Sequence, residues 1–391
     1  MHELWVLTHK GNEAAIVAAM KQGKVPANLK FQFVGDKKLH HPNRLIARFQ
    51  DWQWYIEWTR HALPVARKLC SKIDFDLVHH ISYSTWRVAS PLHSLGLPFI
   101  WGPLGGGEQV PRNFYSVLSP SSCLFEFVRS LSNFRSSNSS AVRETARRAA
   151  FVLASNRDTL EILRRLRGSN KGLDTLSHVF FNQPKIVQFS KASKRKSFRG
   201  KLQLFAGGNL EGRKGVALAV EALAIVKSRD VPFQYTYGGY GPELAHLRSL
   251  TCRLDLEDHV SFVAGFSGDE YIDRLALTHI YLLPSLRDNA GLTLVEAMLC
   301  GCVPIVLALG GPGEIVEQNS GVLIPASDRA RVVSTIAEEI IRLHHDRTSL
   351  ERMSFAASQR IASVYNEQSY LRRMDSIYRS VADQSQEDEP T

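Results

Sequence analysis

Cysteine, proline and long apolar runs are all scarce in this sequence, and each scarcity excludes a class of protein. The 391 residues include only five cysteines and 16 prolines. An odd number of cysteines without paired spacing makes us expect no disulfide framework and a reducing compartment. No stretch reaches the roughly 18 apolar residues of a membrane span, and we expect no signal peptide. The remaining composition, 44% hydrophobic and 22% charged, is typical of a folded protein, here of two domains.

Positive charge is concentrated in one half of the chain. The first 195 residues contain 28 Lys and Arg against 13 Asp and Glu, a net charge of +15, whereas the rest contains 20 against 25, a net charge of −5. This asymmetry indicates that the first half faces something anionic, such as phosphates, nucleic acid or a lipid surface. Simple drift in charge is the alternative.

Short apolar runs rich in β-branched and aromatic residues alternate with amphipathic helical stretches, which predicts βα units and parallel sheets. The strands expected in the first half are 3–8, 30–35, 75–81, 98–102, 150–155 and 178–182. Those expected in the second half are 202–208, 233–239, 259–265, 279–284, 304–309 and 321–325. The fold class is therefore α/β, with two doubly wound, Rossmann-like domains that face each other across a cleft.

The boundaries follow from composition. We expect an N-terminal domain at 1–184, a polar, basic linker without periodicity at 185–200, and a C-terminal domain at 201–365. A C-terminal helix at 366–382 packs back toward the first domain, and a disordered tail occupies 383–391.

The first informative segment is FAGGNLEGRKGVALAVEAL at 205–223, a strand, a glycine turn and a helix. Gly207 and Gly208 let the backbone approach a ligand, while Arg213 and Lys214 add their charge to the positive end of the helix dipole. Such a turn suits a diphosphate. The alternative is that Arg213 is a solvated loop cation.

The second segment, LLPSLRDNAGLTLVEAMLCGCVPIVLALGGPGEIVE at 282–317, is more specific. A strand runs into a turn with Asp288 and Asn289, and the following helix carries Glu296, whose carboxylate suits ribose hydroxyls. An acid favoured by the helix dipole is the alternative for Glu296. A second glycine turn at Gly310 and Gly311 offers further backbone N–H groups to phosphates.

From about Leu202 to about Ser380, the chain resembles family 4 of the retaining glycosyltransferases, which have the two-domain GT-B fold. The family motif has two glutamates eight positions apart in a context like that of PSLRDNAGLTLVEAMLCGCVP; here Asp288 stands at the first and Glu296 at the second. The resemblance implies that Arg213 and Lys214 bind the donor diphosphate and stabilise the leaving nucleotide, that Glu296 holds the ribose and that Asp288 lies near the sugar. It implies a donor-binding set of Gly207, Gly208, Asn289, Gly291, Leu292, Gly310 and Gly311, and no metal or other cofactor besides the nucleotide-diphosphate sugar itself.

The N-terminal half resembles members of this family that act in polysaccharide or lipopolysaccharide assembly, through DFDLVHHISYSTWR (74–87) and PFIWGPLGGGEQVP (98–111). Gly105, Gly106 and Gly107, followed by Glu108, would let backbone approach a ligand in the cleft, although a structural turn is an alternative. His79 and His80 are candidates for contact with the sugar or the acceptor; because side chains alternate along a strand, we expect one of the two to lie in the core. Relative to family members, the first β-α unit is expected to be missing, through a mis-assigned start or a truncation.

Two segments combine aromatic and basic residues. RLIARFQDWQWYIEWTRHALPVARKLCSK (44–72) is a candidate for a membrane interface, and VPRNFYSVLSPSSCLFEFVRSLSNFR (110–135) is a candidate lid or acceptor groove. Packing in a core is the alternative for both.

The function expected from all these features is retaining transfer of a sugar to a glycan or lipid-linked glycan acceptor in cell-surface polysaccharide assembly. We expect a cytoplasmic protein that can lie on the inner face of the cell membrane, at an anionic surface, and that binds no nucleic acid. A nucleotide-sugar epimerase on the same fold and a catalytically degenerate scaffold that binds membranes or nucleic acid are the alternatives.

Overall fold

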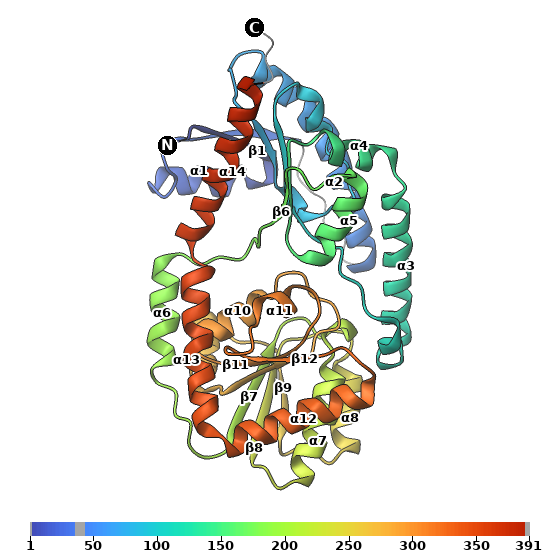
Figure 1. Cartoon of the computed structure of the whole chain (residues 1–391), viewed down its shortest axis with the longest axis vertical. Coiled ribbons are helices and arrows are strands. Elements are labelled where there is room, and N and C mark those ends of the chain that lie inside the picture. The colour runs from blue at the N-terminus through green and yellow to red at the C-terminus, as the bar shows by residue number, and fades with distance from the viewer. Residues whose placement is uncertain (1, 36–43, 388–391) are drawn as a thin grey trace.

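The computed structural model describes residues 2–35 and 44–387, which form two lobes with the termini of the chain at the upper one (Figure 1). Both lobes are built from parallel strands flanked by helices, so the expected α/β class with two Rossmann-like domains is confirmed.

The C-terminal lobe contains a six-stranded parallel sheet in the order β12-β11-β10-β7-β8-β9. Its four inner strands are almost completely buried because helices cover both faces, whereas the outer strands β9 and β12 are partly buried. The strands are β7 (Leu202–Gly207), β8 (Phe233–Gly238), β9 (Val260–Val263), β10 (Ile280–Leu283), β11 (Val303–Leu307) and β12 (Val322–Ile324). The helices are α6 (Gln183–Ser193), α7 (Val216–Ser228), α8 (Leu244–Arg253), α9 (Gly268–Leu277), α10 (Leu292–Leu299), α11 (Gly310–Ile315), α12 (Arg329–His345) and α13 (Arg347–Val364).

The strand order of this sheet reverses between β7 and β10. The chain runs outward from β7 through β8 to β9, returns to β10 beside β7, and then runs the other way through β11 to β12. In open parallel sheets, ligands bind in the crevice outside the carboxyl ends of the strands at such a reversal. The topology therefore points to the loops that follow β7 and β10.

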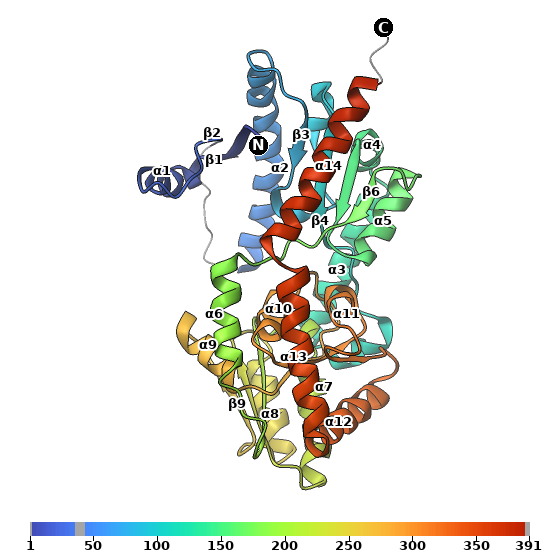
Figure 2. The same ribbon diagram turned by 60° about the vertical axis from the view of Figure 1, so that its left-hand side comes forward.

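The N-terminal lobe contains a four-stranded parallel sheet in the order β3-β4-β5-β6 and a separate parallel pair, β1-β2. The pair and α1 project to one side of this lobe (Figure 2). The strands are β1 (Leu4–His9), β2 (Leu29–Val34), β3 (Val78–His80), β4 (Phe99–Leu104), β5 (Phe151–Ala154) and β6 (Leu173–Thr175). The helices are α1 (Glu13–Lys21), α2 (Arg44–Cys70), α3 (Pro120–Ser137), α4 (Ser140–Arg148) and α5 (Arg157–Arg167), with short 3₁₀ turns between them.

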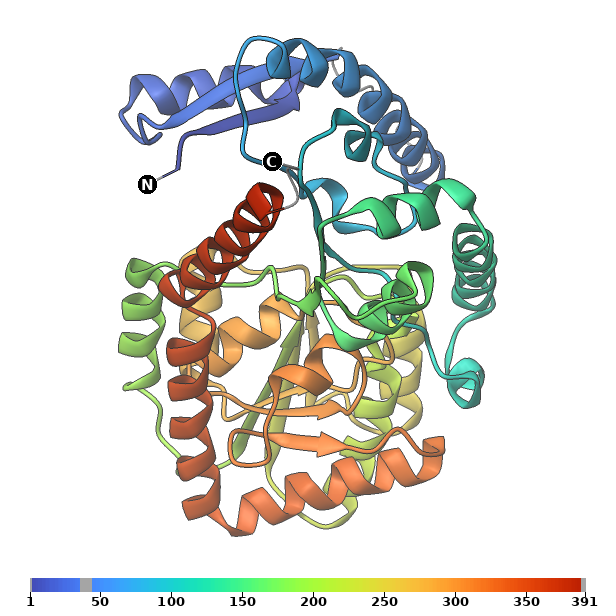
Figure 3. The same cartoon turned by 45° about the horizontal axis from the view of Figure 1, so that its top comes forward.

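The last helix, α14 (Glu367–Glu387), crosses from the C-terminal lobe to the N-terminal one (Figure 3). Its Met374, Ile377 and Val381 are buried against Ile100 and Leu153 of the N-terminal sheet. Because α14 continues the chain from the C-terminal lobe and buries apolar side chains against the N-terminal sheet, it ties the two lobes together. It also includes residues 383–387, so the expectation of disorder there is wrong; the remaining four residues lie outside the described ones.

Two further expectations near the domain boundary are wrong. The basic linker at 185–200 begins as helix α6, because Ile186, Phe189 and Ala192 recur at helical spacing and are buried in the C-terminal core. The strand expected at 178–182 is not one: Val179 and Phe181 are apolar because they pack in that same core, and the strand of this region is β6.

Among the α2 side chains that the structure describes, Tyr55 and Trp58 do not form an exposed membrane surface. Tyr55 and Trp58 are buried with Ala62 against Val88, and the Trp58 indole donates a hydrogen bond to the carbonyl of Val34. Packing explains these aromatic residues, whereas Trp52 lies outside those whose side chains are described.

Candidate functional site

The turn that follows β7 brings two cations to the carboxyl edge of the C-terminal sheet. Gly215 adopts φ 64°, and a Cβ atom there would come within 2.0 Å of the Pro284 carbonyl oxygen, so this position requires glycine. The tight contact holds the turn against the loop after β10, where Leu286 donates its backbone N–H to the carbonyl of Arg213 at 2.8 Å. Arg213 and Lys214 therefore lie at the reversal point of the strand order.

Lys214, Arg213 and Asp288 form a compact ionic cluster. The Lys214 ammonium group lies 2.5 Å from Oδ2 of Asp288, and both side chains are largely buried. Arg213 pairs with Glu211 at 2.6 Å and lies 3.9 Å from the other Asp288 oxygen. Burial lowers the pKa of Lys214 while the nearby Asp288 carboxylate raises it, so the position strongly favours an anionic neighbour.

Asp288 and Asn289 sit on the second glycine turn. A Cβ atom on Gly310 would lie 2.4 Å from the Asp288 carbonyl oxygen, and one on Gly311 would lie 1.9 Å from that of Asn289. The Gly311 N–H donates to the Asp288 carbonyl at 3.1 Å. These glycines permit the close approach of the two loops. Gly291 precedes α10 in the left-handed conformation, and Leu292, the first residue of that helix, is exposed.

The triple-glycine loop of the N-terminal lobe faces this turn. Asn289 accepts hydrogen bonds from Ser155 Oγ at 2.6 Å and from Asn156 Nδ2 at 2.7 Å, at the end of β5. A Cβ atom on Gly105 would lie 2.2 Å from the amide of Asn289, and one on Gly310 would lie 3.5 Å from Cγ of Glu108. The structure thus brings together the predicted residues Gly105, Glu108, Asp288, Asn289, Gly310 and Gly311 across the two lobes.

Glu108 is buried and is held from several sides. It accepts hydrogen bonds from the Gly106 N–H at 3.2 Å and from Asn156 Nδ2 at 2.5 Å, and Arg129 lies 3.5 Å away. Gly107 is fixed by a hydrogen bond from its N–H to Thr159 Oγ1. The loop is therefore held in place by hydrogen bonds within its own lobe, with a buried carboxylate at its end.

Glu296 and the strand-end glycines have other neighbours than the residues of this contact. Burial raises the pKa of Glu296, partly offset by Tyr271 of α9 and by Lys185 of α6. Gly207 and Gly208 end β7, where the Gly208 N–H donates to the Gly238 carbonyl. Glu296 is thus on the side of the sheet that α6 and α9 cover.

His79 and His80 point to opposite faces, as expected, but both have partners inside the protein. His80 bonds to Tyr55 and to Ser90, whereas His79 bonds to Tyr378 of α14 and to the carbonyl of Gly102. Burial lowers the pKa of each ring to about 4. Their hydrogen-bonding atoms serve the packing of α2 and α14, so the structure does not support the expectation that they contact a substrate.

Sequence reasoning missed an ionic contact that joins the lobes. Arg287 of the loop after β10 forms a bidentate pair with Glu126 of α3, at 2.7 Å, and both side chains are at most 10% exposed. Two serines at the start of α3, Ser119 and Ser122, donate to the carboxylate of Glu243 in the C-terminal lobe. Arg287 lies within a motif that the sequence singled out, but nothing in the sequence indicated its partner.

A known protein family matches the C-terminal lobe. The family model described as glycosyl transferases group 1 matches residues 188–360. The matched residues run from helix α6 into helix α13 of the C-terminal lobe. The match confirms the resemblance in the region where the motifs lie.

Curated relatives match about half of the chain. The chain is 30% identical over 188 residues to the putative colanic acid biosynthesis glycosyltransferase WcaL of Salmonella typhimurium, which is 46% of this chain and 45% of that protein. It is 31% identical over 189 residues to the amylovoran biosynthesis glycosyltransferase AmsK of Erwinia amylovora, with 46% and 45% covered. The alignments thus span about half the length of these relatives.

Solved structures match nearly the whole chain in fold. Sucrose-phosphate synthase from Thermosynechococcus elongatus aligns with TM-score 0.61 at 18% identity, over 91% of this chain and 84% of that one. Anabaena HepE, solved in complex with UDP, aligns with TM-score 0.60 at 15% identity over 99% and 100%. The chain therefore has the two-domain GT-B fold.

The described residues contain neither a helix suited to cross a membrane nor a cluster suited to hold a metal ion. In 2–35 and 44–387, no helix is long and apolar enough to cross a bilayer. Across the same ranges, no group of three His, Cys, Asp or Glu side chains is arranged to hold a metal ion.

Proposed function

We propose that this protein is a retaining glycosyltransferase that moves a sugar from a nucleotide-diphosphate sugar to a glycan or lipid-linked glycan acceptor in cell-surface polysaccharide assembly. The observation that carries the proposal is the Arg213–Lys214–Asp288 cluster. It lies at the strand-order reversal of a group 1 domain and faces the triple-glycine loop of the other lobe.

The cluster suits a diphosphate leaving group. Negative charge grows on the leaving nucleotide as the glycosidic bond breaks, and positioned cations stabilise that charge best in a site that excludes water. Arg213 and Lys214 are two such cations, held by a buried turn. In the structure Asp288 pairs with Lys214, so the donor diphosphate competes with this carboxylate and leaves it close to the transferred sugar.

The polysaccharide context rests on the relatives named for colanic acid and amylovoran biosynthesis. Retention, the ribose contact of Glu296 and independence from metal rest on the family resemblance. No enzyme nucleophile stands out among the predicted site residues, so we propose a front-face route in which the leaving phosphate helps to deprotonate the acceptor hydroxyl.

The first experiment is a thermal-shift screen of nucleoside diphosphates and nucleotide sugars, followed by a transfer or donor-hydrolysis assay with the donor that binds. Lys214→Ala should lower kcat about 10²–10³-fold, the usual loss when one stabilising group is removed. Lys201→Ala, an exposed lysine of the same lobe, is the matched control and should leave kcat unchanged. NMR of the product anomer tests retention.

Two other functions would give different results. An epimerase would change the sugar of the donor without needing an acceptor. A degenerate scaffold would show no turnover with any donor, together with salt-sensitive binding to nucleic acid. Turnover that Lys214→Ala leaves intact would refute the assigned role of the cluster.

A further inference from the structure

Helix α3 has two faces of opposite character. Glu126 is buried and pairs with Arg287 of the other lobe, so this face holds the lobes together. The opposite face is apolar, and its five large side chains are 51–66% exposed. We call these five residues the α3 stripe: Leu124, Phe127, Val128, Leu131 and Phe134. At about 100° per residue these five positions fall within an arc of about 120°. They form one continuous apolar surface with no acidic residue among them.

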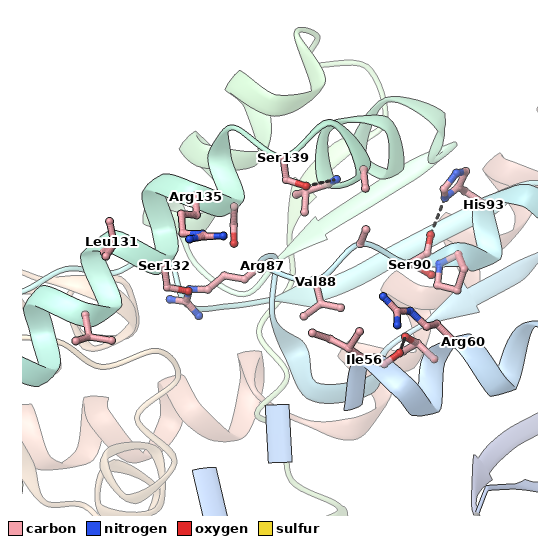
Figure 4. A pocket seen from close by; sticks show the side chains of 17 residues that line it. Ile56, Arg60, Arg87, Val88, Ser90, His93, Leu131, Ser132, Arg135 and Ser139 are labelled. Carbon is pink, nitrogen blue, oxygen red and sulfur yellow. Dashed lines mark hydrogen bonds between the residues drawn. The ribbon is translucent and has the colours of Figure 1, made fainter. Parts of the chain in front are cut away.

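A cavity of about 670 Å³ opens beside the α3 stripe, between α2, the turn at Pro91–Leu95 and the end of α3 (Figure 4). Val128 and Leu131 belong to both the stripe and the cavity wall, so the two surfaces are continuous. We call this cavity the α2–α3 pocket.

The α2–α3 pocket is cationic. Arg60, Arg87 and Arg135 line it, with His93 and four serines, and none of the lining residues whose side chains the structure describes is acidic. Arg60 and Arg135 are exposed, from α2 and α3 respectively. The acid nearest to His93, Glu144, lies 4.0 Å away and pairs at 2.9 Å with Arg148. Glu108 and Glu126 interact with Arg87, so the cations that the described lining leaves for a ligand are Arg60 and Arg135.

Arg87 connects the pocket to the triple-glycine loop. Its Nη2 donates to the Gly106 carbonyl at 2.6 Å and its Nε donates to Asn133 Oδ1 at 2.5 Å, while the same side chain lines the pocket. A ligand in the pocket is thus separated from the triple-glycine loop by a single side chain.

We propose that the α3 stripe and the α2–α3 pocket together bind an anionic phospholipid of a membrane. The stripe lies in the apolar layer, and the lipid phosphate is held in the pocket by Arg60 and Arg135. This site goes beyond the proposed function, because lipid binding does not require turnover; combined with that function, it brings the cleft to a lipid-linked acceptor.

The chemistry favours this occupant. A phosphate needs cations that are not already paired, and arginine presents a fork that matches its oxygens. An apolar stripe of phenylalanine and leucine beside such a site is what an interfacial helix provides, since apolar burial and attraction to anionic headgroups add together. A soluble anion would use the pocket and leave the stripe exposed to water.

The test is co-sedimentation of the full chain with phosphatidylcholine vesicles, with and without phosphatidylglycerol. We expect binding that requires phosphatidylglycerol and weakens with salt. Arg60→Ala/Arg135→Ala should lower the affinity about 30-fold, because each cation near an anionic surface contributes about 1 kcal/mol, or about fivefold in affinity. Phe127→Ser/Phe134→Ser should lower it roughly tenfold or more through lost apolar burial.

Matched controls are on the other lobe. Phe355 of α13 is an exposed phenylalanine and Arg248 of α8 an exposed arginine, so Phe355→Ser and Arg248→Ala should bind vesicles as the unchanged protein does. Circular dichroism of every variant separates lost binding from lost folding.

The outcomes separate this proposal from its competitors. No binding to phosphatidylglycerol vesicles at low salt overturns it, as does equal loss in the control variants. If the protein instead dimerises in ultracentrifugation and Phe127→Ser/Phe134→Ser abolishes the dimer, the stripe is an interface between copies and the proposal is wrong. Vesicle binding without sugar transfer leaves it standing and counts against the proposed function alone.

Discussion

Acid should destabilise this protein through buried histidines, and His80 allows the effect to be measured. Its ring is almost completely buried, with Nδ1 bonded to Ser90 at 2.7 Å and Nε2 to Tyr55 at 3.0 Å. Burial lowers the pKa of His80 in the folded state to about 4 from its ordinary value of 6.5. Protonation of the folded chain would leave a buried imidazolium facing partners chosen for the neutral ring.

The sign follows from which state binds the proton first. Between pH 6.5 and about 4 the unfolded chain is protonated at this histidine and the folded chain is not, so acid favours unfolding. The stabilisation is complete above pH 6.5 and is lost as the pH falls. For His80 alone the loss is about 2 kcal/mol at pH 5 and about 3 kcal/mol at pH 4.

The assay is urea denaturation followed by tryptophan fluorescence at pH 8 and pH 5, with the unchanged protein, His80→Gln and His61→Gln. Glutamine does not titrate, so the stability difference between His80→Gln and the unchanged protein should shrink by about 2 kcal/mol from pH 8 to pH 5. His61→Gln, at an exposed position of the same lobe, should show a much smaller change.

A stability difference for His80→Gln that is the same at both pH values would refute the reasoning. If His80→Gln does not fold, an NMR titration of the unchanged protein decides the matter directly. A pKa near 6.5 for His80 in the folded state would also refute the reasoning.

Three further predictions concern the cleft. Arg287→Ala should destabilise the protein by about 3–5 kcal/mol in urea denaturation, because it leaves Glu126 buried without its partner, while Arg287→Met/Glu126→Leu should recover most of the loss; equal losses in the two would contradict this. Gly215→Ala should weaken donor binding and stability far more than Gly200→Ala, since both glycines have positive φ but only Gly215 would clash, with the Pro284 carbonyl; similar effects would show that backbone strain alone matters. Transfer activity should be unchanged in EDTA, and a loss restored by a divalent cation would overturn the proposal of metal independence.

Most strands could be predicted from the sequence because burial on both faces of a parallel sheet leaves a continuous apolar run between turn residues. The same logic failed at 178–182, where Val179 and Phe181 are apolar for a different reason, packing in the C-terminal core without a strand. It failed again at α6, whose basic surface residues obscured three buried positions at helical spacing.

The site residues were predictable where one segment supplies them, as with Arg213 and Lys214 on a single turn. They were not predictable where two distant segments meet. Glu126 and Arg287 are 161 positions apart, and their pairing depends on the way the lobes face each other. The aromatic residues of α2 and α3 illustrate the same limit: both helices combine rings with arginines, yet Tyr55 and Trp58 are buried whereas Phe127 and Phe134 are exposed.

The unequal charge of the two halves is consistent with two kinds of electrostatic interaction, one at short range in the C-terminal half and one at long range in the N-terminal half. The C-terminal half carries a net charge of −5, yet the donor site that we propose there has two cations within a few ångströms of the proposed diphosphate position. Interactions at such distances in a partly buried site outweigh surface acids further away than the screening length of about 8–10 Å. The net charge of +15 on the other half acts differently, because a field summed over a whole surface steers an extended anionic partner toward it. A small donor thus needs only local cations, whereas a membrane is attracted by an extended positive charge, and the residues that line the α2–α3 pocket all belong to the basic half of the chain.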